Sequence, residues 1–445
     1  MPARDSDVDA CPGALRLHAA ADGPLARVRL PGGLLTGERL AVLLELAEAY
    51  GDGHLELTSR GNVQLRGLRS ADPAVLAARL SAAGLLPSES HETVRNVVAP
   101  PMADLALRTL VEDLDRALCA DPALAALPGR FLFALGEVPL AADVAAVPSS
   151  DKFTILFAGH DHGVRVPASE VVPALLAAAH AFLAERAAAP VGAPAWRLHE
   201  LPDGPARVAH RTATTLATPT AQDTPDDAPG TPIAGAGTPA TTRGTSATAV
   251  GASATAAGTA SAALSASAEA GREPGGAEPA SAASLVGVLP QDDGLVAVGA
   301  LVPLGRLGGE ALRLLSTARR LVVTTARGVI VPDLTPEAAR RWMRALAEAG
   351  LAVEDTSRWV GVTACAGRPG CAKSLADVRA DADSTSTYAD GLPVHWIGCA
   401  RGCGSPSGPH VRVEATPAGY AVTRQPDGET YTGDPATAVA AARRN

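Results

Sequence analysis

The chain has 445 residues, with 38 basic against 47 acidic side chains and a formal net charge of −9. This length corresponds to two or three domains, and the acidic balance argues against a nucleic-acid-binding or anionic-membrane-binding protein. No uncharged apolar run reaches the ~18 residues that span a bilayer. The stretch after Met1 also lacks the apolar core of a signal peptide, so a cytoplasmic protein is expected.

The first predicted elements are a helix, a pair of strands and a second helix. Leucines at helical spacing predict a helix over residues 36–50, which Gly51 terminates. Apolar residues alternate over 55–65, as in strands. The second helix begins at Pro73, since proline is favoured in a first turn, and ends at Gly84, where glycine adopts a left-handed cap. Together they predict a small α+β unit.

The same pattern recurs 266 residues later, the offset from Thr58 to Thr324. Arg320-Leu-Val-Val-Thr-Thr corresponds to His54-Leu-Glu-Leu-Thr-Ser, and Glu348-Ala-Gly-Leu corresponds to Ala82-Ala-Gly-Leu, with no gap between these anchors. Strand, helix and glycine therefore match in one register, which predicts a duplicated unit.

Between the two copies lies a segment of different composition. Residues 213–283 consist largely of alanine, threonine, serine, glycine and proline, and few large apolar side chains are present to offset the entropy of folding. We predict a disordered linker there, either an insertion without function or a tether for partner docking. The remaining predicted segments are 11–88, 89–212, 284–354 and 355–445.

Four of the six cysteines are grouped near the end of the sequence. They are spaced C-x5-C-x27-C-x3-C, at Cys365, Cys371, Cys399 and Cys403. In a cytoplasmic chain, grouped cysteines bind metal more often than they form disulfides. The first spacing is wider than in zinc sites, whereas four thiolates are the ligand set of an iron–sulfur cubane. We predict a [4Fe–4S] cluster on these cysteines, with zinc or unligated thiols as alternatives.

Three stretches resemble the nitrite/sulfite reductase superfamily. They are Leu57-Thr-Ser-Arg-Gly-Asn-Val-Gln-Leu-Arg-Gly, Thr93-Val-Arg-Asn-Val-Val-Ala and the cysteine set. The resemblance covers nearly all of the chain except the linker. It implies a duplicated α+β architecture, in which two ferredoxin-like half-domains (11–88 and 284–354) pair, and two larger α/β domains (89–212 and 355–445) enclose the cofactors.

Within this superfamily, Cys11-Pro-Gly and the sequences around the cysteine pairs resemble the precorrin-3B synthase branch. That branch implies oxygen-dependent hydroxylation and γ-lactone formation on precorrin-3A in aerobic cobalamin biosynthesis. Sulfite reductases carry a second lysine where this chain has Thr154. This difference argues against a sulfite reductase and leaves a nitrite reductase open. A sirohaem-dependent nitrite or sulfite reductase is the first alternative, and a non-catalytic iron–sulfur or zinc protein is the second.

The resemblance also implies the site residues. Precorrin-3A and sirohaem are rich in carboxylates, which the arginine fork binds through two parallel hydrogen bonds. The expected catalytic residues are Arg60, Arg95 and Lys152. Asn62, Gln64 and Arg66 share a strand face with Arg60 because side chains alternate, although a solvated face gives the same pattern. The expected tetrapyrrole-binding residues are therefore Arg60, Asn62, Gln64, Arg66, Arg95, Asn96 and Lys152.

Cofactors and partners follow from the same resemblance. Oxygen activation implies a mononuclear iron in addition to the cluster. Its candidate ligands, none of which is assigned, are His91, His160, His162, His395 and His410. No Gly-x-Gly-x-x-Gly element follows a strand and opens a helix. Electrons are therefore expected from an external donor, a ferredoxin or an NAD(P)H-dependent reductase, and neither nucleic acid nor a membrane is expected as a partner.

Overall fold

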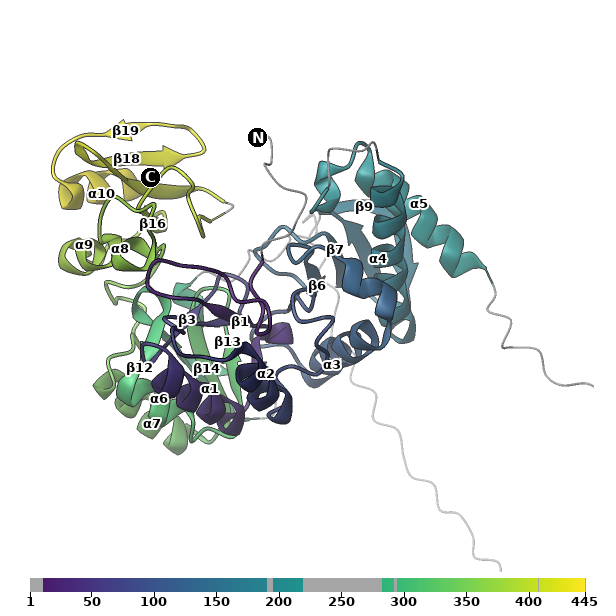
Figure 1. Ribbon diagram of the computed structural model, residues 1–445, viewed down its shortest axis with the longest axis horizontal. Helices are drawn as coiled ribbons and strands as arrows, with labels where there is room; N and C mark the ends of the chain where they lie inside the picture. Colours follow the sequence, from purple (N-terminus) through teal and green to yellow (C-terminus); the bar gives the residue numbers. More distant parts are fainter. Residues whose placement is uncertain (1–10, 190–194, 219–281, 292–293, 407, 445) are drawn as a thin grey trace, which may run out of the picture. The chain divides into compact units, whose positions relative to one another are not determined.

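The computed structural model describes residues 11–189, 195–218, 282–291, 294–406 and 408–444 (Figure 1). These residues belong to one compact unit, and the predicted α+β class is confirmed, with four sheets and helices from both halves of the chain. The predicted linker falls largely outside the described residues. Its predicted start at 213 is wrong, because helix α5 (Gly204–Ala217) continues through it. The other segment boundaries stay predictions.

The first repeat contains the predicted unit of a helix, two strands and a second helix, preceded by two short strands that the sequence did not predict. Its elements are β1 (Ala26–Val28), β2 (Leu34–Leu35), α1 (Gly37–Tyr50), β3 (His54–Leu57), β4 (Val63–Leu65) and α2 (Pro73–Ala82). The Thr36 hydroxyl caps α1 by accepting from the Arg39 amide, and the Asp72 carboxylate caps α2 by accepting from the Ala74 amide.

The second repeat has the same order of elements, preceded by one extra strand. They are β10 (Gly287–Pro290), β11 (Val296–Leu301), β12 (Arg306–Gly308), α6 (Gly309–Leu315), β13 (Leu321–Val323), β14 (Gly328–Leu334) and α7 (Pro336–Glu348). The turns correspond atom by atom: Gly61 N donates to Thr58 O and Arg327 N to Thr324 O, both at 3.1 Å. The duplication is therefore visible in the structure.

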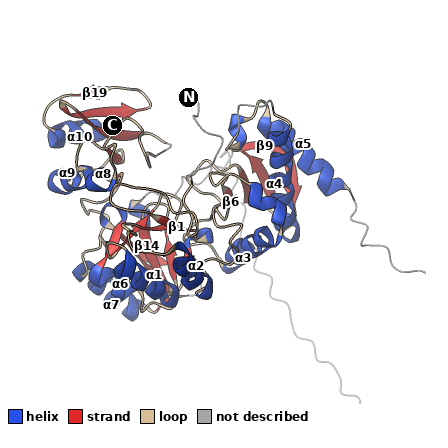
Figure 2. Ribbon diagram, in the orientation of Figure 1, coloured by secondary structure: helices blue, strands red, loops and turns tan. Residues whose placement is uncertain are grey.

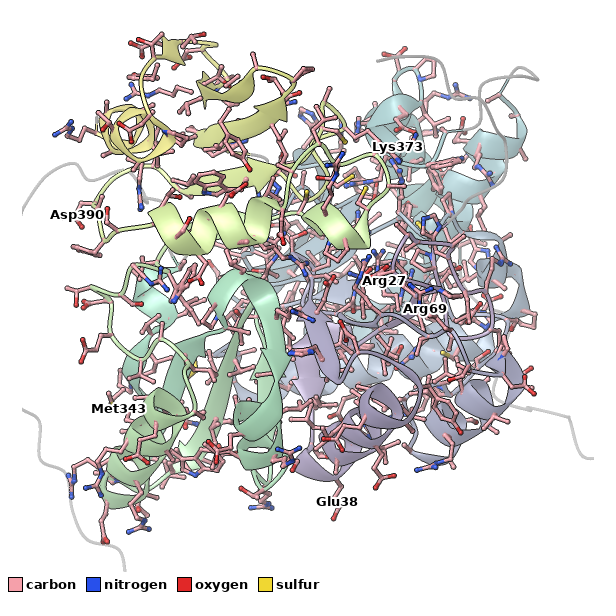
Figure 3. All side chains as sticks on the ribbon, turned by 60° about the vertical axis from the view of Figure 1, so that its left-hand side comes forward. Arg27, Glu38, Arg69, Met343, Lys373 and Asp390 are labelled. Atoms are coloured by element: carbon pink, nitrogen blue, oxygen red, sulfur yellow. The ribbon has the colours of Figure 1, made fainter. Side chains whose placement is uncertain are left out.

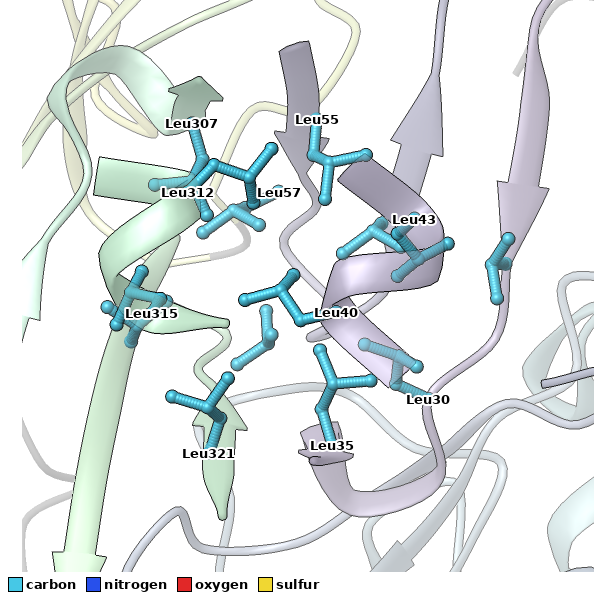
Figure 4. Packing of buried hydrophobic residues seen from close by; sticks show 14 of the residues in the cluster. Leu30, Leu35, Leu40, Leu43, Leu55, Leu57, Leu307, Leu312, Leu315 and Leu321 are labelled. Carbon is cyan, nitrogen blue, oxygen red and sulfur yellow. The ribbon is translucent and has the colours of Figure 1, made fainter. Parts of the chain in front are cut away.

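The two repeats exchange a strand. Their sheets run β1-β4-β3-β12 and β10-β11-β14-β13-β2, so each contains one short strand from the other repeat. Leu307 pairs with Leu55 in the first sheet, and Leu34 pairs with Val322 in the second. The helices α1, α2, α6 and α7 gather on one side of these strands (Figure 2). Leucines of both repeats consequently form one hydrophobic core (Figure 4).

The exchange requires a close backbone approach at Gly33, just before β2. A Cβ atom there would lie 2.0 Å from the Val323 carbonyl oxygen, and Gly33 has a left-handed φ of +70°. Gly53 has a similar φ of +75° but open space around it. We expect Gly33→Ala to lower the free energy of unfolding by about 3 kcal/mol and Gly53→Ala by about 1 kcal/mol. Urea denaturation measures both, and equal losses would contradict the close approach.

A third sheet, β5-β6-β7-β8-β9, follows the first repeat. Its elements and covering helices are β5 (Val97–Val98), α3 (Leu105–Ala120), β6 (Phe133–Leu135), β7 (Val144–Ser149), β8 (Lys152–Phe157), β9 (His160–Val166) and α4 (Val171–Ala187). Within the described residues, one helical stretch, Ala168–Ala187, could cross a membrane by length and composition alone, and half of its apolar window is buried. Core helices of soluble proteins meet the same criterion.

The fourth sheet, β15-β16-β17-β18-β19, carries the cysteines in its loops. Its elements are β15 (Val362–Ala364), α8 (Gly367–Gly370), α9 (Val378–Thr385), β16 (Val394–Ile397), β17 (His410–Thr416), β18 (Gly419–Gln425), β19 (Thr430–Tyr431) and α10 (Pro435–Arg443). β15, β16 and β17 are parallel, so the carboxyl ends of these three strands meet at one edge.

Candidate functional site

The parallel pairing of β15 and β16 brings two cysteine loops together. Cys365 directly follows β15, and Cys399 lies two residues beyond β16. The Cys365 amide donates to the Trp396 carbonyl at 2.9 Å, and the Gly398 amide donates to Cys365 Sγ at 3.3 Å. A backbone amide therefore already points at one sulfur, as the glycines around these cysteines suggest.

The four thiols lie close enough for the other three to act electrostatically on Cys403. Burial is the main cause that raises the pKa of the Cys403 thiol; Arg401 opposes it, and Cys365, Cys399 and Cys371 raise it further. In the described part of the chain, no three or more His, Cys, Asp or Glu side chains are placed closely enough for a single metal ion. The donor set of four thiols on adjacent loops nevertheless suits a cubane, which spreads its ligands more widely than one ion does.

Glycine is required where the two cysteine loops pack on each other. A Cβ atom at Gly398 would lie 1.7 Å from Ser374 Oγ, and Leu375 N donates to Gly398 O at 2.8 Å. Gly402 and Gly404, which flank Cys403, have left-handed φ angles of +59° and +82°. Lys373 is exposed on the loop after Cys371 (Figure 3).

His395 is a buried histidine that is hydrogen-bonded to the backbone of the last cysteine, Cys403. Burial, followed by the nearby Arg327, lowers the pKa of His395 to about 3, so the ring is neutral. Nε2 donates to the Cys403 carbonyl at 3.0 Å, and Nδ1 accepts from the Thr363 hydroxyl at 2.7 Å. Both nitrogens of His91 are likewise hydrogen-bonded, to Ser88 and to the Asp121 carbonyl. These two candidates for an iron ligand already have internal partners.

Four arginines lie in one electrostatic environment, in which Arg60 is repelled by each of the other three. We call them the arginine cluster: Arg27, Arg29, Arg60 and Arg197. Burial, followed by the charges of Arg197 and Arg27, lowers the pKa of Arg60 to about 10. Burial, followed by the charge of Arg27, lowers the pKa of Arg29 to about 9. Arg29 is only 2% exposed, and its Nε and Nη2 have no hydrogen-bond partner among the described residues. Such a concentration of cations favours an anionic ligand.

Only part of the predicted polar strand face belongs to this cluster. Arg60 lies half-buried in the turn between β3 and β4. Gln64 Oε1 accepts from Arg27 Nη2 at 3.0 Å, whereas Asn62 is buried and its Oδ1 accepts from the Leu30 amide at 2.8 Å. Arg66 turns away to Asp22, which it binds through two hydrogen bonds of 2.8 and 2.9 Å.

The other predicted residues lie elsewhere. Arg95 forms a double hydrogen bond with Asp115, at 2.7 and 2.6 Å, and a third with the Leu85 carbonyl. The Asn96 amide donates to the carbonyls of Thr93 and Gly129. Lys152 is exposed at the tip of the β7–β8 hairpin. Asp143, whose carboxylate acts electrostatically on Arg60, precedes β7 at the opposite end of that hairpin. The structure therefore does not group Arg95 or Lys152 with Arg60.

The Arg95–Asp115 pair predicts a large effect on stability. Arg95 is 4% exposed, so Asp115→Ala leaves a buried guanidinium without its counter-charge, and we expect a loss of about 3 kcal/mol in the free energy of unfolding. Asp113, two residues before Asp115 on the same helix, pairs with Arg116, but that pair is exposed. Asp113→Ala is the matched control, with an expected loss below about 0.5 kcal/mol by urea denaturation. Similar losses in both variants would contradict the structural role of Arg95.

Sequence reasoning missed three members of the arginine cluster and Asp143. Arg27 and Arg29 alternate on and just after β1, a spacing that places both side chains on one face. Arg197 is identified only by the fold, because the buried Asp143 carboxylate accepts from Arg197 Nε at 2.7 Å and from two backbone amides. The alternation of Arg27 and Arg29 was the signal available in the sequence.

Comparisons with known proteins agree with this architecture. Residues 18–83 match the family described as Nitrite/Sulfite reductase ferredoxin-like half domain. Over 90 residues the chain is 38% identical to a ferredoxin–nitrite reductase of Leptolyngbya laminosa, covering 20% of this chain and 18% of that protein. Over 96 residues it is 35% identical to a precorrin-3B synthase of Sinorhizobium sp., covering 22% and 20% respectively. These matches thus span about a fifth of each relative.

Among solved structures, the NirA protein of Mycobacterium tuberculosis superposes with a TM-score of 0.63. The superposition covers 90% of this chain and 74% of NirA, at 17% sequence identity. At that identity the likeness concerns the fold. The first repeat therefore resembles the half domain of nitrite and sulfite reductases, and the described chain has the fold of NirA.

Proposed function

We propose that this chain is a tetrapyrrole-binding iron–sulfur oxidoreductase of the precorrin-3B synthase type. The proposed reaction is oxygen-dependent hydroxylation of precorrin-3A with formation of a γ-lactone. The observation that carries the proposal is the arginine cluster, in which Arg29 and Arg60 have strongly lowered pKa values. Carboxylates of a tetrapyrrole would relieve this repulsion through charge-assisted hydrogen bonds.

The individual residues suit different parts of that task. Arg60 is half-buried, so its guanidinium can meet a ligand while protein atoms shield it from bulk water. The guanidinium groups of Arg27 and Arg197 are positioned by hydrogen bonds that they donate to Gln64 and Asp143, respectively. Pro12, within the Cys11-Pro-Gly motif, accepts from Arg29 through its carbonyl at 2.5 Å. The motif that resembles the precorrin-3B synthase branch thus contacts the arginine cluster.

The cysteines complete the proposal. Cys365, Cys371, Cys399 and Cys403 would hold a [4Fe–4S] cluster, which supplies one-electron transfer when bound. Gly398 donates a hydrogen bond to Cys365 Sγ, and His395 holds the Cys403 carbonyl. An external donor, a ferredoxin or an NAD(P)H-dependent reductase, would supply the electrons. Cytoplasmic location is part of the same proposal.

A sirohaem-dependent nitrite reductase is the second candidate. The alignment with a ferredoxin–nitrite reductase over 90 residues favours it, and sirohaem carboxylates would suit the same arginines. Against it, Thr154 is buried in the position where sulfite reductases carry a second lysine, and Lys152 is exposed. A small oxyanion would therefore find less positive charge at this hairpin.

One assay separates the two candidates. Anaerobically purified protein is mixed with precorrin-3A, a chemical reductant and oxygen, and the product is analysed by mass spectrometry. The proposal predicts a product heavier by one oxygen atom and no sirohaem absorption. Reduction of nitrite with reduced methyl viologen, together with sirohaem bands, would favour the second candidate and overturn the first.

A further inference from the structure

Three arginines that we call the arginine clamp, Arg66, Arg327 and Arg379, hold the cysteine loops by their carbonyls. Arg66 Nη2 donates to Gly370 O at 2.8 Å, and Gly370 immediately precedes Cys371. Arg379 Nε donates to Cys365 O at 3.2 Å. Arg327 Nη2 lies 3.4 Å from Gly404 O, directly after Cys403. Each arginine thus contacts the backbone at, or next to, a different predicted ligand.

The clamp carries one more positive charge than its carboxylates balance. Glu56 receives Arg379 at 2.6 Å and faces Arg66 at 3.6 Å, and Asp22 binds Arg66 at 2.8 Å. Three cations therefore meet two carboxylates. Arg327 makes no ion pair among the described residues, although Glu56 and Cys365 both act on it electrostatically. The surplus charge consequently belongs to Arg327, beside the cysteine loops.

Arg327 has a strained backbone conformation, which indicates that an arginine side chain is retained there for a functional reason. Arg327 has a left-handed φ of +59°, which costs free energy for any residue with a Cβ atom. The equivalent residue of the first repeat is Gly61, with a φ of +68°. Two glycines leave room for the arginine, because a Cβ atom at Gly305 or at Gly404 would lie 2.8 Å from its side chain. The second repeat thus keeps an arginine where glycine is the unstrained choice.

We propose that Arg327 is an electrostatic positioning residue, whose uncompensated charge raises the reduction potential of the cluster held by the four cysteines. The inference rests on the proposed [4Fe–4S] cluster. Reduction adds negative charge to the cluster, so a cation nearby favours the reduced form. At an effective dielectric of about 20, a unit charge roughly 10 Å away changes this equilibrium by about tenfold.

The test is a redox titration of the full chain with its cluster, followed by EPR. Arg327→Gln should shift the midpoint potential downward by about 59 mV, the equivalent of tenfold for one electron. Arg327→Lys should stay close to the wild type, because the charge remains. Arg69→Gln is the control, since Arg69 is exposed three residues after Arg66. A potential unchanged in Arg327→Gln, with the cluster present, would overturn the inference.

Two further results keep the outcome unambiguous. If Arg327→Gln loses its cluster, Arg327→Gly reproduces the residue of the first repeat and removes the backbone strain. It should fold at least as well as the wild type and show the same downward shift, and an unchanged potential there also overturns the inference. A wild-type chain that holds no cluster refutes the proposed cofactor itself, which is a different result from equal potentials.

Discussion

Replacing Cys399 by serine should leave the purified chain without an intact [4Fe–4S] cluster. The wild type is expected to contain about four irons and about four acid-labile sulfides per chain. Cys399 lies two residues beyond β16, beside the loop of Cys365, and the two cysteines outside the predicted set, Cys11 and Cys119, belong to the first half of the chain. A serine hydroxyl is a harder and far less acidic ligand than a thiol. Iron and sulfide analysis after anaerobic purification measures the loss.

The matched control for this variant is Cys119→Ser. Cys119 lies on α3, where burial raises the pKa of its thiol to about 11, and it is remote in sequence from the grouped cysteines. This variant should keep the full complement of iron and sulfide. A full cluster in Cys399→Ser, or an equal loss in Cys119→Ser, would remove Cys399 from the ligand set.

The second large effect concerns Arg60. Arg60→Met should weaken the binding of precorrin-3A by about 10- to 100-fold, because a charge-assisted hydrogen bond contributes roughly 1.5–3 kcal/mol. The free energy of unfolding should fall little, since the variant removes one of several mutually repelling cations. Anaerobic titration monitored by the tetrapyrrole absorption measures the dissociation constant.

Two comparisons sharpen this experiment. Arg69→Met removes an exposed arginine from the same repeat and should leave the affinity unchanged. Arg95→Ala should lower stability instead, because the Arg95 guanidinium binds Asp115 and the Leu85 carbonyl. If Arg95→Ala weakens tetrapyrrole binding while Arg60→Met does not, the arginine cluster is not the carboxylate site.

Local signals predicted the central helix–strands–helix unit of the first repeat, α1, β3, β4 and α2, but not its first two strands. The helical spacing of leucines before Gly51, the proline at the start of the second helix, the glycines after both helices and the alternation over residues 55–65 are short-range features. The structure follows them, and it adds the caps at Thr36 and Asp72. The duplication was equally accessible, because one offset aligns strand, helix and glycine without a gap.

The strand exchange was not predictable in the same way. β2 has two residues and β12 has three, too few to show a period, and their partners lie more than two hundred residues away along the chain. Pairing of this kind is decided by packing of the shared leucine core rather than by local propensity. The close approach at Gly33 becomes meaningful only once Val323 is known to face it.

The roles of individual arginines could be predicted only in part, for a similar reason. The sequence shows that Arg60 and Arg66 share a strand face, but not that Asp22 and Gly370 claim Arg66. It likewise cannot show Asp115 beside Arg95. Since an arginine is equally suited to a carboxylate of the protein and one of a ligand, only the fold separates structural arginines from those left uncompensated.

The most direct test is an optical and EPR spectrum of anaerobically purified protein, recorded together with metal and sulfide analysis. A broad absorption shoulder in the blue without sirohaem bands, with about four irons and about four sulfides per chain, is the predicted result. Zinc in place of iron, with no acid-labile sulfide, would contradict the proposed cluster on Cys365, Cys371, Cys399 and Cys403.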